Sequence, residues 1–293
     1  YFSILNFFDL FTPAWGIVEA VKRMYSIYPD VVFSKGGYAS YPTVFAARLL
    51  RIPVVIHESD ASPGRVNRWA GKFAKKIAVS YPEAAEFFPK EKVALLGNPV
   101  RKDIRTPAYE GSREFLNLEA STPVILILGG SLGADRINGT ILEALPRLVE
   151  RYEIIHQTGE KLFKEVTGTA NIILEGNPRQ SRYKSFNYLN TVSLRMAAGA
   201  ATIAISRAGS GAIFELASWG LPAILIPIPE EVSHDQRKNA FAYAREGGAI
   251  ILEQNNLTPN VLASEIDRLV DHPELREKMK ESAKRFARLD ASE

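Results

Sequence analysis

The sequence has 293 residues, of which 46% are hydrophobic and 24% charged, and this composition is typical of a folded globular protein rather than a disordered or fibrous one. It contains no cysteine, which excludes disulfides and cysteine-based zinc sites. The formal net charge of +3 is too small to indicate nucleic-acid binding. No uncharged apolar run reaches the roughly 18–20 residues of a membrane-spanning helix, and no stretch has the pattern of a cleavable signal peptide. Because the chain starts at Tyr1 without methionine, we expect a piece of a longer protein.

Short apolar runs alternate with longer amphipathic segments along almost the whole chain. Apolar runs bounded by glycine, proline or polar residues predict buried parallel strands at 30–34, 53–57, 76–80, 93–96, 124–128, 153–156, 171–174, 202–206, 223–227 and 249–252. Helical patterns cover 41–50, 63–73, 137–151, 211–219, 236–246 and 258–271. This alternation predicts an α/β fold, and the strands are too many for one sheet of this type, so we expect two Rossmann-like domains.

The polar stretch 98–123 carries prolines and a glycine but no strand pattern, and it marks the expected domain boundary. We therefore expect a first domain at 1–101, a second at 102–272, and a C-terminal helix at 273–293 that packs back on the first domain. The segment 1–21 is rich in aromatic and aliphatic residues at loose helical spacing, and Lys22 and Arg23 follow it. It fits either a helix that covers the first sheet or an apolar patch that rests on a membrane surface.

Ligands in open α/β sheets bind where strands end and helices begin, so the residues after each strand are the candidates for a site. The turn 129–134 (Gly-Gly-Ser-Leu-Gly-Ala) follows a predicted strand. Its glycines and Ser131 fit a cradle for a diphosphate. The same sequence also matches the Gly-x-Ser-x-Gly motif of the nucleophile elbow in hydrolases, and a hydrolase would need a later histidine such as His156 or His234. A tight turn that only packs is the third interpretation.

A second glycine-rich turn follows the strand 202–206. It contains Arg207, Gly209, Ser210 and Gly211, and Glu215 comes one to two helical turns later. That offset suits a carboxylate that binds ribose hydroxyls while the helix N-terminus faces phosphates, although a solvated helix acid is the alternative. Two such turns in one domain predict a nucleotide-diphosphate site.

The helix that starts near Asp235 carries Gln236 and Asn239, three residues apart and so on one helix face. These amides fit contacts with sugar hydroxyls, or a capped surface helix without a ligand.

The first predicted domain also places polar residues after adjacent strands. Gly36, Gly37 and Tyr38 follow the first strand, and His57 and Glu58 end the second. Titratable groups in this position suit acid–base chemistry, but a buried histidine bonded to backbone is the alternative for His57. The four histidines are isolated along the chain, so no metal site is predicted.

Several of these motifs occur in an order that resembles the MurG family of UDP-N-acetylglucosamine transferases. They are 35–38 (Lys-Gly-Gly-Tyr), 53–58 (Pro-Val-Val-Ile-His-Glu), 97–101 (Gly-Asn-Pro-Val-Arg), 129–131 (Gly-Gly-Ser), 156–159 (His-Gln-Thr-Gly), 206–209 (Ser-Arg-Ala-Gly), and Asp235-Gln236 with Asn239-Ala240. The resemblance covers about Pro29 to Thr258, most of the chain.

This resemblance implies a GT-B fold, with two Rossmann-like domains facing a cleft. It implies inverting transfer of N-acetylglucosamine from UDP-N-acetylglucosamine to undecaprenyl-pyrophosphoryl-MurNAc-pentapeptide, at the cytoplasmic face of the bacterial membrane and without a cofactor or metal. His57 and Glu58 would be catalytic, and Gly36, Gly37 and Tyr38 would lie on the acceptor side. The donor would be bound by Asp60, Arg101, Gly130, Ser131, Arg207, Gly209, Ser210, Gly211, Glu215, Gln236 and Asn239.

The sequence departs from the family pattern in ways that bear on activity. The family's opening strand, with its glycine-rich loop that contains a histidine and is a candidate source of the catalytic base, has no counterpart, and Asp60 stands where asparagine is usual. Three alternatives therefore stay open: another GT-B transferase with a lipid or small-molecule acceptor, a UDP-N-acetylglucosamine 2-epimerase, and a UDP-sugar-binding fragment without catalysis.

Overall fold

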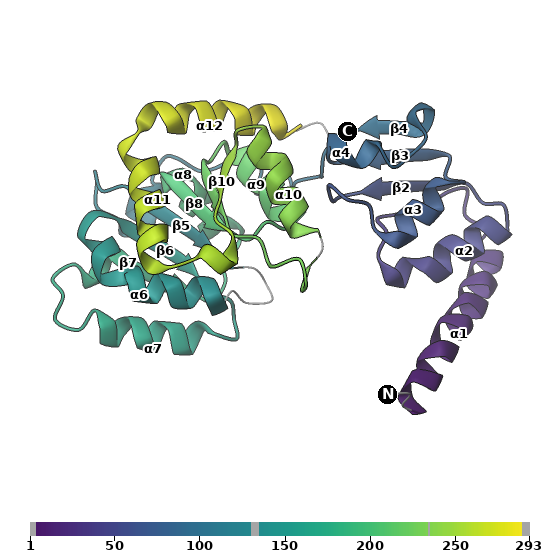
Figure 1. Ribbon diagram of the computed structural model, residues 1–293, viewed down its shortest axis with the longest axis horizontal. Coiled ribbons are helices and arrows are strands. Elements are labelled where there is room, and N and C mark those ends of the chain that lie inside the picture. The colour runs from purple at the N-terminus through teal and green to yellow at the C-terminus, as the bar shows by residue number, and fades with distance from the viewer. Residues whose placement is uncertain (1–3, 130–134, 234, 289–293) are drawn as a thin grey trace. The chain divides into compact units, whose positions relative to one another are not determined.

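The chain folds into two compact units, Tyr1–Asn98 and Pro99–Glu293, each built on one parallel sheet (Figure 1). The computed structural model describes residues 4–129, 135–233 and 235–288. The predicted α/β class with two sheets is confirmed, since one sheet has four strands and the other six. The division at Asn98 lies at the start of the predicted linker; the finer domain bounds drawn from the sequence stay predictions.

The first unit contains a four-stranded sheet in the order β1-β2-β3-β4, with every neighbouring pair parallel. Its core is formed by the apolar residues of the strands and of the helices packed on them, such as Ile56, Ile77 and Val44. Its strands are β1 (Val32–Ser34), β2 (Val54–Glu58), β3 (Lys76–Val79) and β4 (Val93–Leu95); its helices are α1 (Ile4–Ile27), α2 (Tyr41–Leu49), α3 (Arg65–Gly71) and α4 (Pro82–Ala85), with 3-10 turns η1 (Tyr38–Ser40) and η2 (Lys90–Lys92).

Helix α1 contacts α2 along its C-terminal half, while the ribbon of its first half extends away from the sheet (Figure 1). Met24 enters the core of the first unit, and Ala20 and Val21 pack against that core. Trp15 and Val18 are 73% and 60% exposed. The last turns of α1 are thus part of the core, which agrees with the interpretation of a helix that covers the first sheet. The exposed Trp15 and Val18 precede these turns and form the kind of apolar surface that the membrane interpretation expects.

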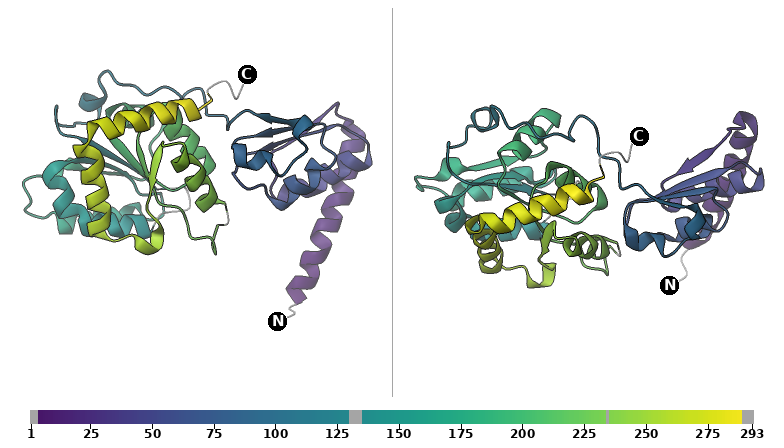
Figure 2. Two further views of the ribbon diagram at one scale, coloured as in Figure 1. Left: turned by 45° about the horizontal axis from the view of Figure 1, so that its top comes forward. Right: turned by 90° about the horizontal axis from the view of Figure 1, so that it is seen from above.

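The second unit contains a six-stranded sheet in the order β10-β9-β8-β5-β6-β7, also parallel throughout. Helices lie on both faces of this sheet (Figures 1 and 2). Its strands are β5 (Val124–Leu128), β6 (Glu153–Gln157), β7 (Tyr183–Phe186), β8 (Ile203–Ser206), β9 (Ala223–Leu225) and β10 (Ala249–Ile251); its helices are α5 (Ser112–Phe115), α6 (Asp135–Arg151), α7 (Phe163–Ile173), α8 (Thr191–Ala200), α9 (Ser210–Trp219), α10 (Gln236–Arg245), α11 (Pro259–Asp271) and α12 (Pro273–Phe286), with 3-10 turns η3 (Gln180–Arg182) and η4 (Gln254–Asn256).

The central strands of this sheet are apolar on both faces because helices cover both. All five residues of β5 are buried, and Ile125 and Ile127 pack with Ile137 and Ile141 of α6. Burial of each such side chain contributes about 1.5–3 kcal/mol. Since all strands run the same way, their carboxyl ends form a single edge of the sheet, and the candidate site lies on that edge.

One predicted strand is wrong. Residues 171–174 belong to the end of α7 and the residue after it, and the strand at this point of the fold is β7. Val166, Ala170 and Leu174 are buried at four-residue spacing, which is the period of a helix and not of a strand. Strand β7 is an edge strand whose four residues are only half-buried, so it has no apolar run.

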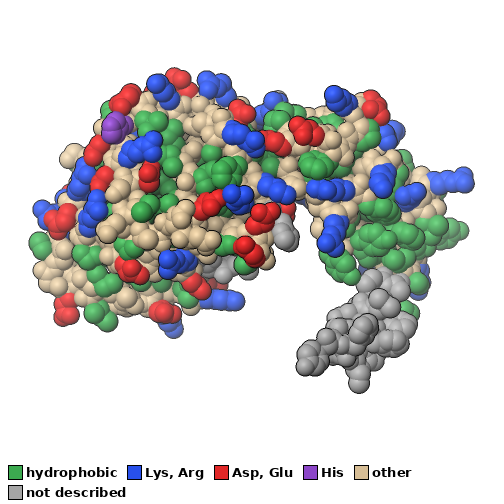
Figure 3. Space-filling model, viewed as in Figure 1, with side chains coloured by type: hydrophobic (Ala, Val, Ile, Leu, Met, Phe, Trp, Pro, Cys, Tyr) green, Lys and Arg blue, Asp and Glu red, His purple; other side chains and the backbone are tan. Residues whose placement is uncertain are grey.

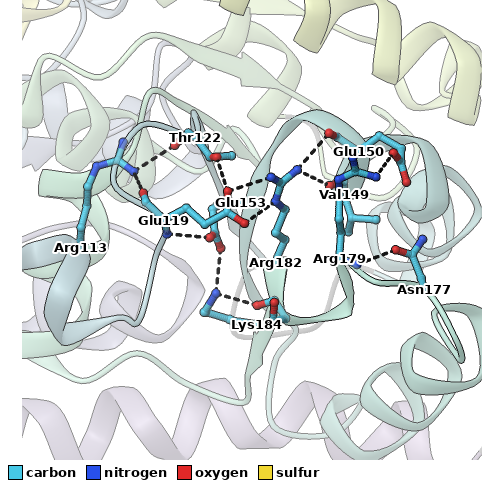
Figure 4. A network of polar contacts seen from close by, with 11 residues as sticks. Arg113, Glu119, Thr122, Val149, Glu150, Glu153, Asn177, Arg179, Arg182 and Lys184 are labelled. Carbon is cyan, nitrogen blue, oxygen red and sulfur yellow. Dashed lines mark hydrogen bonds and ion pairs between the residues drawn. The ribbon is translucent and has the colours of Figure 1, made fainter.

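Polar partners from distant segments hold β7 in place (Figure 4). Lys184 Nζ lies 2.7 Å from Glu153 Oε2 at the start of β6, and Glu119 N donates to Glu153 Oε1 at 2.9 Å. Arg182 binds the Glu119 carboxylate with both its Nε and Nη2, and these bonds lower the pKa of Glu119 to about 2. This network lies at the amino end of the strands, away from the edge that carries the candidate site.

The C-terminal helix α12 packs on α9 within the second unit, where the Phe286 and Phe214 ring centroids are 4.9 Å apart. The expectation that the segment 273–293 also packs on the first domain stays a prediction.

Candidate functional site

A pocket of about 370 Å³ lies at the carboxyl ends of β5, β6 and β8, within the second unit. The residues that line it come from strand ends, from the loops after them, from α8, α9 and α10, and, in the case of Arg101, from the segment between β4 and α5. They are Arg101, Leu128, Gly129, Gln157, Tyr188, Leu189, Leu194, Ser206, Arg207, Gly209, Ala212, Glu215, Ile228 and Gln236.

The pocket gathers five of the predicted donor-binding residues: Arg101, Arg207, Gly209, Glu215 and Gln236. The others lie elsewhere, and their roles stay predictions. Ser210 and Gly211 form the first turn of α9 beside the lining, Asp60 belongs to the first unit, and Gly130 and Ser131 lie outside the described residues. Asn239 is fully buried and outside the lining, so its shared helix face with Gln236 does not bring both amides into the pocket.

The N-terminus of α9 faces the pocket, and the Gly209 position before it carries no side chain that could cap the helix. Gly209 precedes the helix with an extended backbone, and the first bond inside the helix runs from Ile213 N to Gly209 O at 3.0 Å. The amides before Ile213 therefore have no acceptor within the helix. A Cβ atom on Gly209 or Gly211 would meet open space, so packing does not require glycine at either position. The arrangement suits close approach by an anion, with the helix dipole favouring negative charge.

Glu215 lines the same pocket from the second turn of α9. Among the described residues, its carboxylate has no hydrogen bond and no ion pair within 4 Å. Burial raises the pKa of Glu215, and the charge of Arg101 opposes this shift. A half-buried carboxylate without protein partners is an acceptor for hydroxyl groups of a ligand.

Arg207 supplies a cation to the pocket lining at the end of β8. Its Nη1 donates to Ile226 O at 3.1 Å, while its buried Nε has no partner among the described residues. Burial lowers the pKa of Arg207, and the charge of Asp135 opposes this. A fixed guanidinium beside an uncapped helix N-terminus suits a phosphate group.

Two glutamines of the lining bind main-chain groups. Gln236 Oε1 accepts from Ala208 N and from Ile228 N, each at 3.3 Å, and so joins the loops after β8 and β9. Gln157, which was not predicted as a site residue, makes comparable bonds at the end of β6. Tyr188, Leu189 and Leu194, which also were not predicted, belong to the apolar part of the lining, together with Leu128, Ala212 and Ile228. Two signals were available for Gln157: its position at a strand end and its place in the motif 156–159.

In the first unit, the loop after β1 is shaped by glycine. Gly36 and Gly37 have φ values of 81° and 82°, which favour glycine, and a Cβ on Gly36 would lie only 2.6 Å from Asn67 Nδ2. Tyr38 is 77% exposed. The three predicted acceptor-side residues thus lie together on one strand-end loop, beside Lys35, whose Nζ donates to Asn98 Oδ1 at 3.2 Å.

His57 and Glu58 are buried at the end of β2, and both have structural contacts. His57 Nε2 donates to Gly97 O at 2.9 Å, and burial lowers the pKa of His57. Glu58 accepts from Asp60 N at 3.0 Å, Gly64 N at 3.2 Å and Asn67 Nδ2 at 2.9 Å, while burial raises its pKa. The side chains hold the loop 59–64 and the start of the linker. These contacts fit the backbone-bonded alternative for His57, and the catalytic role of both residues stays a prediction.

His156, a candidate base in the hydrolase interpretation, is fully buried and bonded through both ring nitrogens. Ser131 and His234 lie outside the described residues. Within the described ranges, no group of three or more histidine, aspartate or glutamate side chains could hold a metal ion. No helix in those ranges has the length and apolar character needed to span a membrane.

Comparison with known proteins gives this chain a class and a family. The crystal structure of Acinetobacter baumannii MurG matches with a TM-score of 0.77 and 28% identity, over 96% of this chain and 77% of that one. A Neisseria meningitidis UDP-GlcNAc 2-epimerase bound to UDP-GlcNAc matches with a TM-score of 0.67, over 96% of this chain and 78% of that one, and at 16% identity this likeness concerns the fold alone. The chain has one parallel sheet of four strands and another of six, and its fold matches the MurG crystal structure. Together these observations define a GT-B protein.

The models of the glycosyltransferase family 28 N-terminal and C-terminal domains match residues 1–79 and 124–293. A Bacillus thuringiensis (strain Al Hakam) protein is 39% identical over 270 residues, which are 92% of this chain and 74% of that protein. That relative is named UDP-N-acetylglucosamine–N-acetylmuramyl-(pentapeptide) pyrophosphoryl-undecaprenol N-acetylglucosamine transferase 3. The chain belongs to glycosyltransferase family 28, and within it resembles MurG.

Proposed function

We propose that this family 28 glycosyltransferase moves N-acetylglucosamine from UDP-N-acetylglucosamine to undecaprenyl-pyrophosphoryl-MurNAc-pentapeptide, with inversion at the anomeric carbon. The observation that carries the proposal is Glu215, a carboxylate with no partner among the described residues in a pocket that also contains an uncapped helix N-terminus. Support for the acceptor comes from the relatives, since the name of the Bacillus thuringiensis protein states the sugar, the muramyl pentapeptide and the lipid.

In this proposal the second unit binds the donor. Glu215 accepts hydrogen bonds from the ribose hydroxyls, and the amides at Gly209–Gly211 with Arg207 bind the diphosphate. Gln236 donates to the N-acetylglucosamine through Nε2, because its Oε1 is already used. Arg101 borders the same pocket. The proposed contacts of Gly130 and Ser131 with the diphosphate, of Asp60 with the donor sugar, and of Asn239 rest on the family resemblance alone.

The chemistry needs stabilisation of charge at the diphosphate. The 4-hydroxyl oxygen of the muramyl sugar forms a bond to the anomeric carbon, and the bond from that carbon to the diphosphate oxygen breaks with its electron pair. UDP leaves with that added charge, and the hydroxyl proton passes to a base. Amides and a guanidinium fixed in advance stabilise the leaving group, because they need no reorganisation as the charge develops.

We assign the acceptor to the first unit, on the loop that carries Gly36, Gly37 and Tyr38. The catalytic role of His57 and Glu58 stays part of this proposal: His57 Nδ1 is buried without a partner among the described residues, whereas the Glu58 carboxylate already accepts hydrogen bonds from its own loop and from α3. Tyr38 is the exposed side chain of this loop and is placed to contact a bound sugar or peptide.

We further propose that the first unit rests on the inner face of the plasma membrane. Tyr41 and Phe45 of α2 form a half-buried aromatic cluster with Trp69 of α3 and Phe73, and Arg48 lies over Phe73 at 4.5 Å. Figure 3 shows hydrophobic side chains gathered on the first unit, with lysine and arginine side chains around them. Aromatic rings with basic neighbours suit the boundary between headgroups and acyl chains of an anionic membrane.

The proposed function is tested by calorimetric titration with UDP-N-acetylglucosamine and by transfer of its sugar to the lipid-linked acceptor. Glu215→Gln removes the charge that the ribose hydroxyls would meet, so we expect affinity to fall by about 10- to 100-fold. Glu165→Gln, on the exposed surface of α7, is the matched control and should bind normally. Equal binding by both variants would reject the donor site. Release of a 2-epimerised sugar without acceptor would reject the transferase in favour of an epimerase.

A further inference from the structure

The segment between β4 and α5 is fixed to the second unit by a buried hydrogen bond. Trp219, the last residue of α9, donates from its indole Nε1 to Ile104 O at 2.7 Å. Both residues are buried, with 3% and 0% of their surface exposed. A short bond between a buried side chain and the main chain fixes the segment at this point. We call residues 101–108 the strap.

Helix α8 holds the other end of the strap. Arg195 Nε donates to Thr106 O at 2.9 Å, and Ala108 N donates to Arg195 O at 3.0 Å. A Cβ on Gly199 would lie only 2.0 Å from Ala108 O, so the strap approaches α8 this closely because residue 199 is glycine. Helices α8 and α9 therefore both determine where the strap lies.

The strap brings Arg101 to the pocket described above. Ile104 N and Arg105 N donate to Arg101 O at 3.2 Å and 3.1 Å, so a tight turn joins Arg101 to the bond at Ile104. Arg101 Nη1 lies 3.8 Å from Asp103 Oδ2, but both side chains are half exposed and such a pair contributes little. The position of Arg101 in the pocket lining thus depends mainly on the anchored turn.

Helix α9 connects this anchor with the pocket. Glu215 and Trp219 are four residues apart, so they lie on the same face of the helix, one turn from each other. Trp219 binds the strap at Ile104, and Glu215 lines the pocket that Arg101 also lines. Burial raises the pKa of Glu215, and the charge of Arg101 opposes this shift without an ion pair between the two side chains. Arg101 therefore acts on Glu215 as a neighbouring charge.

We propose that Trp219 and Gly199 are positioning residues that act through the strap and hold Arg101 beside Glu215, so that this carboxylate stays ionised for a ligand with hydroxyl groups and negative charge. The identity of that ligand rests on the proposed function; the arrangement itself lies wholly within the second unit. An indole suits the anchor because it is rigid and its Nε1–H is a donor only. Phenylalanine would keep a ring of similar character but would leave Ile104 O buried without that donor.

The consequence is a link between a buried contact outside the pocket and the charge inside it. Without the Trp219 bond the strap moves, and Arg101 moves with it. Because the charge of Arg101 lowers the pKa of Glu215, its displacement should raise that pKa. A larger fraction of the carboxyl is then protonated at neutral pH, and a protonated carboxyl accepts fewer hydrogen bonds.

The test measures the pKa of Glu215 by carbon-13 nuclear magnetic resonance without ligand, and UDP affinity by calorimetry at neutral pH. In Trp219→Phe of the full chain, we expect the pKa of Glu215 to rise and UDP to bind about three- to tenfold more weakly. Gly199→Ala displaces the strap from the side of α8 and should do the same. The matched controls are Trp15→Phe on the exposed part of α1 and Gly168→Ala in α7, where a Cβ meets open space. Both controls should change neither quantity.

A double variant shows whether Trp219 acts through Arg101. Once Arg101→Gln has removed the charge, adding Trp219→Phe should change neither the pKa of Glu215 nor UDP affinity any further. Additive losses, or an unchanged pKa of Glu215 in Trp219→Phe together with a lower thermal midpoint, would mean a merely structural role and would overturn the proposal. If Trp219→Phe does not fold, Gly199→Ala decides by the same two measurements.

The ligand-free measurement separates this inference from the proposed function. Absence of UDP binding by the unmodified chain would reject the proposed function, while a raised pKa of Glu215 in Trp219→Phe would still support the positioning of Arg101. Normal UDP binding by the unmodified chain, with an unchanged pKa of Glu215 in both strap variants, would overturn the positioning and leave the proposed function intact.

Discussion

His156 lies fully buried at the end of β6, with a partner on each ring nitrogen. Asn138 Nδ2 donates to Thr158 O at 3.1 Å, so Asn138 Oδ1 is the acceptor for His156 Nε2–H at 3.0 Å. Nδ1 then accepts from the Tyr183 hydroxyl, also at 3.0 Å. This neutral ring connects α6, β6 and β7 below the pocket, and burial lowers the pKa of His156 to about 3.

The pH dependence of stability follows from this shift. The folded-state pKa of about 3 lies below the ordinary value of 6.5, so the unfolded chain takes up the proton first as the pH falls. The contribution of His156 is complete above pH 6.5 and is lost between pH 6.5 and about 3, at a rate of up to about 1.4 kcal/mol per pH unit. His156→Gln removes this titration. Urea denaturation at several pH values should show a shallower dependence in that variant.

The control for this prediction is His272→Gln, because His272 is exposed at the end of α11. That variant should keep the dependence of the unmodified chain. An equally steep loss of stability in His156→Gln would mean that carboxylates, and not His156, account for the acid sensitivity.

Helix α9 shows a conflict between stability and binding at the scale of one element. Gly211 is exposed in its first turn, and a Cβ there would meet no atom within 4 Å. Gly211→Ala should raise the unfolding free energy by about 0.5–1 kcal/mol, since alanine favours the helix and reduces the freedom of the unfolded chain. The same methyl group would enter the space in which we place the diphosphate. In Gly211→Ala, the midpoint of thermal denaturation should therefore rise, while the affinity for UDP measured by titration should fall.

Gly168→Ala is the control for α9. Gly168 lies inside α7, and a Cβ on it also meets open space, so alanine should stabilise the chain and leave UDP binding unchanged. Tighter or equal UDP binding by Gly211→Ala would place the anion elsewhere than at the N-terminus of α9.

Individual helices and strands also show how much of the fold and of the candidate site could be predicted from the sequence. Buried strands such as β5 were predictable because both faces are covered, so the whole run is apolar. Strand β7 was not, because Lys184 and Ser185 have partners on other elements: Glu153 on β6 and Thr167 on α7. In the site, Arg207, Gly209 and Glu215 share one strand–turn–helix segment, and their spacing is local. The contacts of Gln157 join residues 28 and 32 positions away, so no local pattern contains them.

At the scale of the whole molecule, the two units carry different surfaces. The second unit contains the pocket with Arg101 and Arg207, with the Glu215 carboxylate that has no partner among the described residues, and with the N-terminus of α9. The first contains the aromatic cluster of α2 and α3 with Arg48 over its rings. The function that we propose, transfer of a sugar from a water-soluble sugar nucleotide to a lipid-linked acceptor, needs both surfaces. If the second unit binds the sugar nucleotide and the first unit binds the membrane, a substitution can remove one activity and leave the other.

This division predicts opposite effects of two variants. Arg48→Gln with Lys72→Gln removes two exposed cations beside the aromatic cluster, at about 1 kcal/mol of attraction to an anionic surface each. The affinity for phosphatidylglycerol vesicles, measured by co-sedimentation, should therefore fall by about 30-fold, more at low salt than at high salt. UDP binding should stay normal, since the pocket lies in the other unit. Glu215→Gln should show the reverse, with weak UDP binding and normal sedimentation. Lys164→Gln on α7 controls for charge alone, and an equal loss of vesicle binding in this variant would show that the first unit has no special affinity for the membrane.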